Sequence, residues 1–170
     1  MPLGTDYARQ DCSLARALEI VGERWTMLIL RDCFLGVRRF SDFLTHLDIS
    51  KAVLSARLDA LVDDGLLTRS GGGHPEYELT DDALALWPAM FALLQWGDRR
   101  TSPGSPRRLY RHVGCGDVGD DGRCSTCGSA PPPGDLESRP GPGADQTLRD
   151  DPVAVALREP HRLLEPLCVR

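Results

Sequence analysis

The sequence predicts a mainly α-helical fold with one small β-hairpin, followed by a small cysteine-rich appendage near the C-terminal end. Apolar residues recur at helical spacing through most of residues 12–100. Two short strand-like segments around residues 66–80 interrupt this pattern. After residue 100 the chain becomes rich in Pro, Gly and Cys, which is typical of a segment that lacks a large apolar core.

Composition limits the possible classes of protein. A chain of 170 residues allows one domain with an appendage. The net charge of −5 excludes a generally basic protein, so nucleic-acid binding would depend on locally placed Arg and Lys. The longest apolar run is far shorter than the ~20 residues of a membrane span. The opening stretch MPLGTDYARQDCS lacks the pattern of a signal peptide. We therefore expect a cytoplasmic protein, without membrane contact, whose cysteines are thiols or metal ligands.

The first two predicted helices cover residues 12–21 and 23–34. The first places Leu14, Leu18 and Val21 on one face. The second is rich in bulky apolar residues, so we expect it to be a central core helix.

The next two predicted helices are short and joined by a tight turn. One begins near Arg39 or Ser41, and the other covers residues 50–64 with Leu54, Leu58, Leu61 and Val62 as its apolar stripe. Ser50 is a suitable N-cap, because its hydroxyl accepts a hydrogen bond from the first turn. A longer, Ser-capped second helix after a tight turn is the helix-turn-helix layout.

Two strands, residues 66–70 and 76–80, are expected to form a hairpin through the glycine-rich loop 71–75. Thr80 is expected to cap one long apolar helix, residues 81–100, which Pro88 would kink. This helix is more apolar than so small a domain can cover, which favours contact with a second copy of the chain. The elements together predict a winged helix-turn-helix fold.

The appendage contains two similar motifs, His112-Val-Gly-Cys115-Gly and Cys124-Ser-Thr-Cys127-Gly. Each resembles a zinc-ribbon knuckle, and three thiolates with one imidazole satisfy tetrahedral Zn²⁺. The motifs predict a zinc site formed by His112, Cys115, Cys124 and Cys127. Free thiols in a disordered segment and a redox disulfide between Cys124 and Cys127 are the alternatives.

The domain boundaries follow from these elements. Residues 1–100 form the winged-helix domain, 101–110 a linker, and 111–143 the zinc-ribbon-like segment. Residues 144–170 form a tail with weak helical patterning, for which the sequence predicts no function.

Several segments in this order and spacing resemble the HxlR-type family of winged-helix transcriptional regulators. They are Cys12, residues 20–31, residues 36–41, residues 49–66 and residues 76–80. The resemblance covers residues 12 to about 97. It implies a homodimer built from the first and last helices of the domain, which binds to double-stranded DNA as a transcriptional repressor or activator, with repression the favoured of the two. A small-molecule or redox effector is also implied.

The resemblance places a set of side chains where a winged helix contacts DNA. The set is Arg38, Arg39, Ser50, Lys51, Ala52, Ser55, Ala56, Arg57 and Arg69. Ala52 and Ala56 stand where the family often carries Lys and Gln, so they are expected to meet thymine methyl groups rather than donate hydrogen bonds. The alternatives are that the whole set consists of ordinary solvated surface residues, or that Arg57 pairs with a nearby acidic residue of the domain. Cys12 occupies the position of the reactive cysteine in thiol-sensing members, with burial at the dimer contact as its alternative.

Two other classes of function compete with this reading. A winged-helix protein–protein adaptor, docking a partner through the zinc module, is favoured by the net negative charge and the alanine-bearing helix face. Enzymatic use of the zinc is least favoured, because four protein ligands leave no open coordination position and no adjacent Glu is present as a general base. We therefore expect that the protein is not an enzyme.

Overall fold

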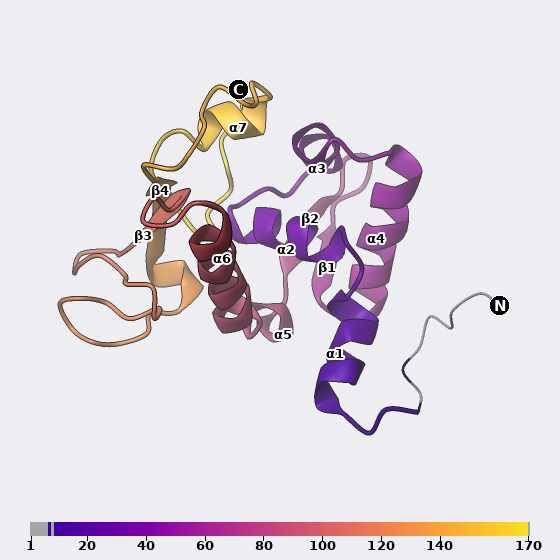
Figure 1. The fold of residues 1–170 in the computed structure, drawn as a ribbon. Helices are drawn as coiled ribbons and strands as arrows, with labels where there is room; N and C mark the ends of the chain where they lie inside the picture. Colours follow the sequence, from indigo (N-terminus) through magenta and orange to yellow (C-terminus); the bar gives the residue numbers. More distant parts are fainter. Residues whose placement is uncertain (1–6, 8, 170) are drawn as a thin grey trace.

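The computed structural model describes Tyr7 and residues 9–169. The first part of the chain forms a winged helix, and the part after residue 101 forms a C-terminal region beside it (Figure 1). The winged helix consists of α1 (Ser13–Val21), α2 (Thr26–Phe34), α3 (Phe40–Leu47), α4 (Lys51–Asp63), β1 (Leu67–Ser70), β2 (Glu76–Leu79), α5 (Asp81–Leu84) and α6 (Trp87–Thr101). The C-terminal region consists of β3 (Arg108–His112), the short 3₁₀ helix η1 (Pro133–Asp135), β4 (Leu136–Pro140), α7 (Pro152–Ala156) and β5 (His161–Arg162).

The core of the winged helix lies where α2, α3, α4 and the hairpin meet. Ile29 and Leu30 of α2, Phe43 of α3, and Leu54 and Leu58 of α4 are completely buried there. Strands β1 and β2 pair antiparallel as the wing, with Arg69 opposite Tyr77. The predicted mainly α-helical winged helix-turn-helix with a small hairpin is confirmed. Within the described part of the chain, every helix is too short or too polar to cross a bilayer.

The predicted caps are present where the sequence places them. The Ser50 hydroxyl accepts a hydrogen bond from the Val53 N–H at 3.4 Å, and the Thr80 hydroxyl accepts one from the Ala83 N–H at 3.3 Å. Gly65, just after α4, has a φ of +73°, the left-handed conformation expected at a helix end.

The predicted long helix over residues 81–100 is divided in the structure. Helix α5 ends at Leu84, and α6 begins at Trp87 with Pro88 in its first turn. Proline has no N–H to continue the hydrogen-bond ladder but is well suited to a first turn. The expected kink is therefore a break between two helices.

The C-terminal region is built on a three-stranded antiparallel sheet in the order β3-β4-β5. β3 begins inside the stretch predicted as a linker, and Tyr110 of this strand is buried. The Tyr110 ring lies 5.7 Å from that of Trp87 and 5.3 Å from that of Phe91, both on α6. These aromatic contacts join the sheet to the winged helix, so one continuous apolar core serves both regions.

The last part of the chain, residues 144–169, is called the strap below because it returns across the winged helix. Its α7 lies beside α3 (Figure 1). The Leu164 N–H donates to the Phe34 carbonyl and the Leu167 N–H to the Gly36 carbonyl, both at 2.9 Å. Gly36 has a φ of +87°, and a Cβ there would lie 1.9 Å from the Glu165 carbonyl oxygen, so only glycine fits this contact. The weak helical pattern of the tail is realised only in α7, whereas residues 161–162 form a strand.

Candidate DNA-binding surface and metal centre

Helix α4 presents its predicted contact residues on one side. Leu54, Leu58 and Leu61 face the core, which leaves Lys51, Ala52, Ser55 and Ala56 exposed on the outer face together with the cap, Ser50. The basic and small residues occupy the N-terminal half of the helix, where free backbone N–H groups favour a phosphate. The exposed carboxylates Asp59, Asp63 and Asp64 lie in the C-terminal half or just after it. The N-terminal half of α4 is thus the part suited to DNA.

Two predicted contact residues, Arg39 and Arg69, lie exposed beside this helix. The Arg39 guanidinium pairs with Glu76 of β2 at 3.2 Å, and its side chain is 66% exposed. The Arg69 guanidinium of the wing pairs with Asp59 of α4 at 3.2 Å. Exposed ion pairs contribute little to stability, so either guanidinium can exchange its carboxylate for a phosphate at small cost.

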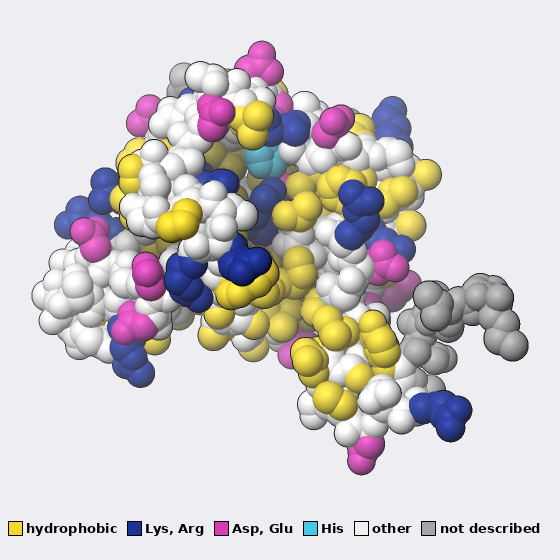
Figure 2. All heavy atoms as spheres, in the orientation of Figure 1, with side chains coloured by type: hydrophobic (Ala, Val, Ile, Leu, Met, Phe, Trp, Pro, Cys, Tyr) yellow, Lys and Arg dark blue, Asp and Glu magenta, His cyan; other side chains and the backbone are white. Residues whose placement is uncertain are grey.

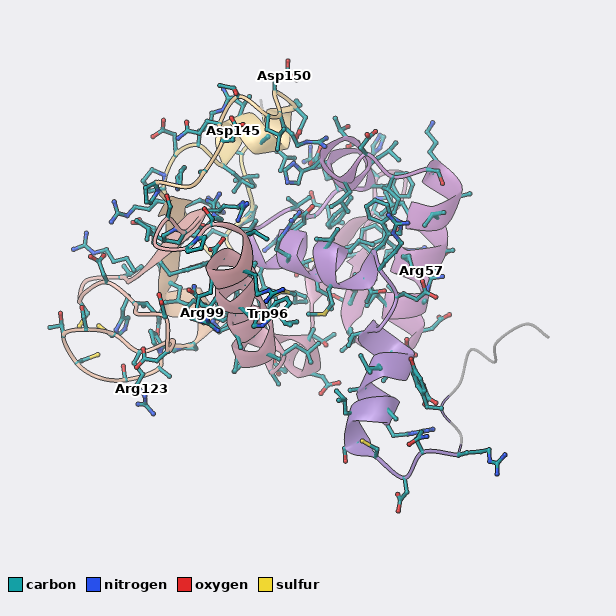
Figure 3. The ribbon with its side chains drawn as sticks, in the orientation of Figure 1. Arg57, Trp96, Arg99, Arg123, Asp145 and Asp150 are labelled. Atoms are coloured by element: carbon teal, nitrogen blue, oxygen red, sulfur yellow. The ribbon has the colours of Figure 1, made fainter. Side chains whose placement is uncertain are left out.

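Arg38 and Arg57 are held differently. Arg38 is 26% exposed, pairs with Glu78 of β2 and donates a hydrogen bond to the Leu164 carbonyl of the strap at 3.1 Å. Its guanidinium therefore joins the wing to the strap. Arg57, which Figure 3 labels along α4, lies 3.9 Å from Glu23, at the limit of an ion pair.

The four predicted zinc ligands come together at the end of β3 and in the loop that follows it. Their ligand atoms all lie within 4.8 Å of one another. The Cys115 and Cys124 sulfurs are 3.5 Å apart, and the Cys127 sulfur lies 3.5 Å from the His112 Nδ1. A tetrahedral site with Zn–S bonds of about 2.3 Å has S–S edges of about 3.8 Å, which is close to the separation of the two sulfurs. The cluster is suitable for one tetrahedral ion.

Backbone turns bring the two motifs together. The Cys115 N–H donates to the His112 carbonyl at 3.0 Å, and the Gly128 N–H donates to the Cys124 carbonyl at 2.9 Å. Gly128 has a left-handed φ of +71°. At Gly116 a Cβ would lie 2.2 Å from the Thr126 hydroxyl, so this glycine allows the two motifs to approach. The identical spacing in the sequence thus corresponds to two facing turns.

Protonation of the cluster is strongly perturbed. Hydrogen bonds with the Cys124 and Cys127 sulfurs raise the pKa of Cys115 to about 11 and also raise the pKa of His112. Hydrogen bonds from Ser129 lower the pKa of Cys127 to about 6. The Cys127 N–H lowers the pKa of Cys124. Sulfurs packed this closely share protons, and a divalent cation would replace those protons.

The remaining cysteines lie apart from the cluster. Cys12 is exposed and directly precedes α1, so its thiol is accessible as sensing requires, but its sensing role stays a prediction. Cys33 is buried in the core, and burial raises the pKa of its thiol, which makes it unreactive.

Some residues of these sites could not be found from the sequence. Glu76 pairs with Arg39, and Glu78 pairs with Arg38. The only sign of this in the sequence is that the two glutamates are two residues apart in a predicted strand, which places them on the same face. Ser129, whose hydroxyl lies 3.0 Å from the Cys127 sulfur, has no motif that distinguishes it from any other serine.

The model of the HxlR-like helix-turn-helix family matches residues 20–105, which is half of the chain. The chain belongs to this family. Rv3095 of Mycobacterium tuberculosis, named an uncharacterized HTH-type transcriptional regulator, is 42% identical over 137 residues, covering 77% of this chain and 87% of that protein. YdeP of Bacillus subtilis, also named an uncharacterized HTH-type transcriptional regulator, is 29% identical over 105 residues, covering 57% of this chain and 82% of that protein.

Among solved structures, the crystal structure of PA1607, titled as a candidate transcription factor, superimposes with a TM-score of 0.60 and 36% identity. The match covers 67% of this chain and 84% of that chain. The alignment with Rv3095 covers 77% of this chain, whereas the family model matches residues 20–105, and only 19 residues lie before that segment. The alignment with Rv3095 must therefore extend beyond residue 105, into the C-terminal region. This HxlR-like protein is a helix-turn-helix transcriptional regulator.

Proposed function

We propose that this HxlR-like protein acts as a homodimeric repressor that places the N-terminal half of α4 in the major groove of DNA. The supporting observation is the exposed face of α4, with Lys51 and Ser50 at its start and no carboxylate before Asp59. Two such helices related by a dimer axis would reach successive major grooves of a pseudo-palindrome. Repression requires only that the bound dimer occupies a promoter, whereas activation also requires a contact with polymerase.

Helix α1 supports the dimer. Of its residues only Ala15 is buried, while Leu14 is 65% exposed, Leu18 39% and Ile20 41%. Figure 2 shows hydrophobic side chains gathered over α1, which projects from the body. A nine-residue helix is unstable by itself in water, so an apolar face of this kind favours a partner. On α6, Leu93 and Trp96 are also more than half exposed.

The contact residues divide into two roles in this proposal. Arg39, Ser50, Lys51, Arg57 and Arg69 contact phosphates and set the position of the protein on the duplex. Ala52, Ser55 and Ala56 meet base edges, with the two alanines against thymine methyl groups. Arg38, which pairs with Glu78 and donates to the Leu164 carbonyl, is predicted by the family resemblance to contact DNA as well.

For the cluster of His112, Cys115, Cys124 and Cys127 we propose a structural zinc ion. Four protein ligands complete a tetrahedron, so the ion would have no free position for catalysis. A non-enzymatic, cytoplasmic regulator is consistent with both sites. A docking role of the zinc region toward another protein is the competing proposal, favoured by the few basic residues on α4.

Binding to the DNA upstream of the protein's own gene, measured by fluorescence anisotropy at several salt concentrations, tests the DNA proposal. Lys51→Ala is expected to weaken binding and to reduce the salt slope by about 1. Arg123→Ala is the matched control, because Figure 3 places Arg123 on the C-terminal region at the opposite end of the view from α4. Absence of sequence-specific binding by a folded, dimeric preparation would contradict the proposal and favour the adaptor.

Light scattering after size exclusion tests the dimer. The wild type is expected at twice the chain mass. Leu14→Glu is expected to give a folded monomer, because it places a charge in the proposed interface. Leu148→Glu is the control, since Leu148 is 77% exposed and lies in the strap. A wild type that is monomeric at tens of micromolar would overturn the dimer.

A further inference from the structure

A cleft of about 230 Å³ lies between the strap, the C-terminal sheet, α3 and the end of α2. Its walls include Arg31 of α2, Leu35 just after this helix, His46 of α3, Arg108 of β3, and Leu157 and Arg158 of the strap. Figure 2 shows a hollow at this place, below α7 and α3, in which basic side chains and a histidine gather. Neither the DNA surface nor the cysteine cluster shares a residue with it.

The charges around the cleft do not balance. Four guanidiniums line it, belonging to Arg31, Arg108, Arg149 and Arg158. Three carboxylates oppose them. Asp32 pairs with Arg31 at 2.6 Å, Asp151 pairs with Arg149 at 2.8 Å, and Asp145 lies in the lining, on the segment before α7 labelled in Figure 3. With His46 counted as neutral, one positive charge remains.

The unbalanced charge lies at Arg108 and Arg158. Neither forms an ion pair with a carboxylate among the described residues; Arg108 donates to the Leu157 carbonyl at 3.3 Å and to the Ser138 hydroxyl at 3.1 Å, and Arg158 donates to the Arg149 carbonyl at 2.9 Å. The Arg108 Nε is buried without an acceptor. Burial lowers the pKa of Arg108, and the nearby charge of Arg31 also lowers it. A partly buried guanidinium without a counter-ion is unfavourable, so the cleft favours an anion.

Apart from these charged groups, His46 and Gln146, the lining is apolar. Leu35, Pro140, Leu148, Ala154 and Leu157 contribute hydrocarbon surface to the cleft. A dry apolar cavity of about 150 Å³ accommodates benzene, so this cleft has room for a ring or a short alkyl chain together with a charged group. We propose that the cleft binds a small organic monocarboxylate, with its carboxylate between Arg108 and Arg158 and its hydrocarbon part against Leu35 and Leu157.

Charge and polarity favour a monocarboxylate over other anions. A phosphate monoester carries about −1.5 to −2 charges at pH 7, which exceeds the single unbalanced positive charge. A sugar acid would place hydroxyls against leucine side chains, which leaves those hydroxyls without partners. A carboxylate also matches the fork of a guanidinium in a bidentate pair. The bound ligand would contact the strap, β3 and Leu35 at the end of α2 together.

Isothermal titration calorimetry of the full chain with benzoate and with hexanoate at pH 7 tests the proposal without DNA. At least one of the two acids is expected to bind with a Kd of about 1 mM or tighter and to raise Tm by mass action. Benzamide and hexanamide, which keep the shape and lose the charge, are expected to bind at least about tenfold more weakly.

Three variants test whether the acid binds in the cleft. Arg108→Gln and Arg158→Gln are each expected to weaken binding of the acid about tenfold, because each removes one guanidinium from the carboxylate. Arg139→Gln on β4 removes an exposed charge outside the cleft and is expected to change nothing. Circular dichroism shows whether each variant folds, and Arg158→Gln decides the result if Arg108→Gln does not fold. The proposal is overturned if neither acid binds at about 10 mM, if the amides bind as well as the acids, or if Arg158→Gln retains full affinity.

Discussion

The winged helix and the segment carrying the cysteine cluster, residues 112–129, are held together by different forces. Large apolar side chains such as Ile29, Phe43 and Leu58 are completely buried in the winged helix. Within residues 112–129 the one buried residue is Cys124. Apolar burial stabilises at roughly 25 cal/mol per Å², so the first region has a large source of stability that the second lacks. The comparison indicates why a metal ion held by the four clustered side chains would stabilise the second region, whereas the first has an apolar core.

The largest effect is expected from removing the buried ligand. Cys124→Ser should abolish zinc binding, because structural sites contribute apparent binding free energies of about 10–16 kcal/mol through a complete ligand set. Amide hydrogen exchange should then increase in residues 112–129 and stay unchanged in α2 and α4. Elemental analysis and exchange mass spectrometry measure the two results.

Cys168→Ser is the control, because Cys168 is exposed and outside the cluster. The zinc prediction is wrong if the wild type, purified under reducing conditions without a chelator, contains well below one zinc per chain. The segment would then be held by backbone turns alone.

The second prediction concerns the junction between the regions. Trp87 is buried between Phe34 at 5.0 Å and Tyr110 at 5.7 Å, measured between ring centroids. Trp87→Ala is expected to destabilise the protein by about 3–5 kcal/mol, as for other buried aromatic residues. Because the core is continuous, urea unfolding should remain a single transition by circular dichroism and by exchange in both regions. Leu148→Ala is the exposed control. Two separate transitions would show that the C-terminal region is an independent domain.

The third prediction concerns how the strap is attached. Asp151 caps α7 by accepting from the Ala154 N–H at 3.0 Å, pairs with Arg149 at 2.8 Å and lies 3.0 Å from the His46 Nδ1 of α3. Asp151→Ala is expected to lower the free energy of unfolding by about 2 kcal/mol, because the helix cap and the partly buried contacts of Asp151 are lost. Asp150→Ala, one residue away and exposed, should cost little. Equal costs for the two variants would show that these contacts do not hold the strap.

The pH dependence of Asp151→Ala sharpens this test. Burial alone would raise the pKa of Asp151, but hydrogen bonds from Arg149, the Ala154 N–H and His46 outweigh burial and hold that pKa below its ordinary value. A carboxylate with a depressed pKa stabilises the fold fully above its unfolded pKa of about 3.9. The stability difference between wild type and Asp151→Ala should therefore be constant at neutral pH and shrink as the pH falls below about 4. Urea unfolding at several pH values measures it.

The parts of this structure that were predictable from sequence depend on local patterns. The caps Ser50 and Thr80, the stripe of α4 and the facing motifs around Cys115 and Cys124 each arise from residues close in the chain. The strap was not predictable, because the contacts that attach it, such as the Leu164 N–H with the Phe34 carbonyl and Asp151 with His46, join residues that are far apart in the chain. Strand β3 was missed for a related reason, since Arg108 pairs with Pro140 across a long intervening loop. The cleft is lined by residues of both the strap and β3, so no pattern in the sequence indicates that its arginines lie together.

The smallest effects are expected at two neighbouring arginines that the sequence treats alike. Arg39 is exposed and loosely paired, whereas Arg38 joins the wing to the strap. Arg39→Ala should weaken DNA binding a few-fold, lower the salt slope by about 1 and leave stability unchanged. Arg38→Ala should cost about 1 kcal/mol of stability, because the Leu164 carbonyl and Glu78 lose a donor, and should change the salt slope less. Anisotropy titrations and urea unfolding of both variants separate the two roles. If Arg38→Ala instead lowers the salt slope as much as Arg39→Ala at unchanged stability, both guanidiniums contact phosphate, and the strap contact of Arg38 gives way when DNA binds.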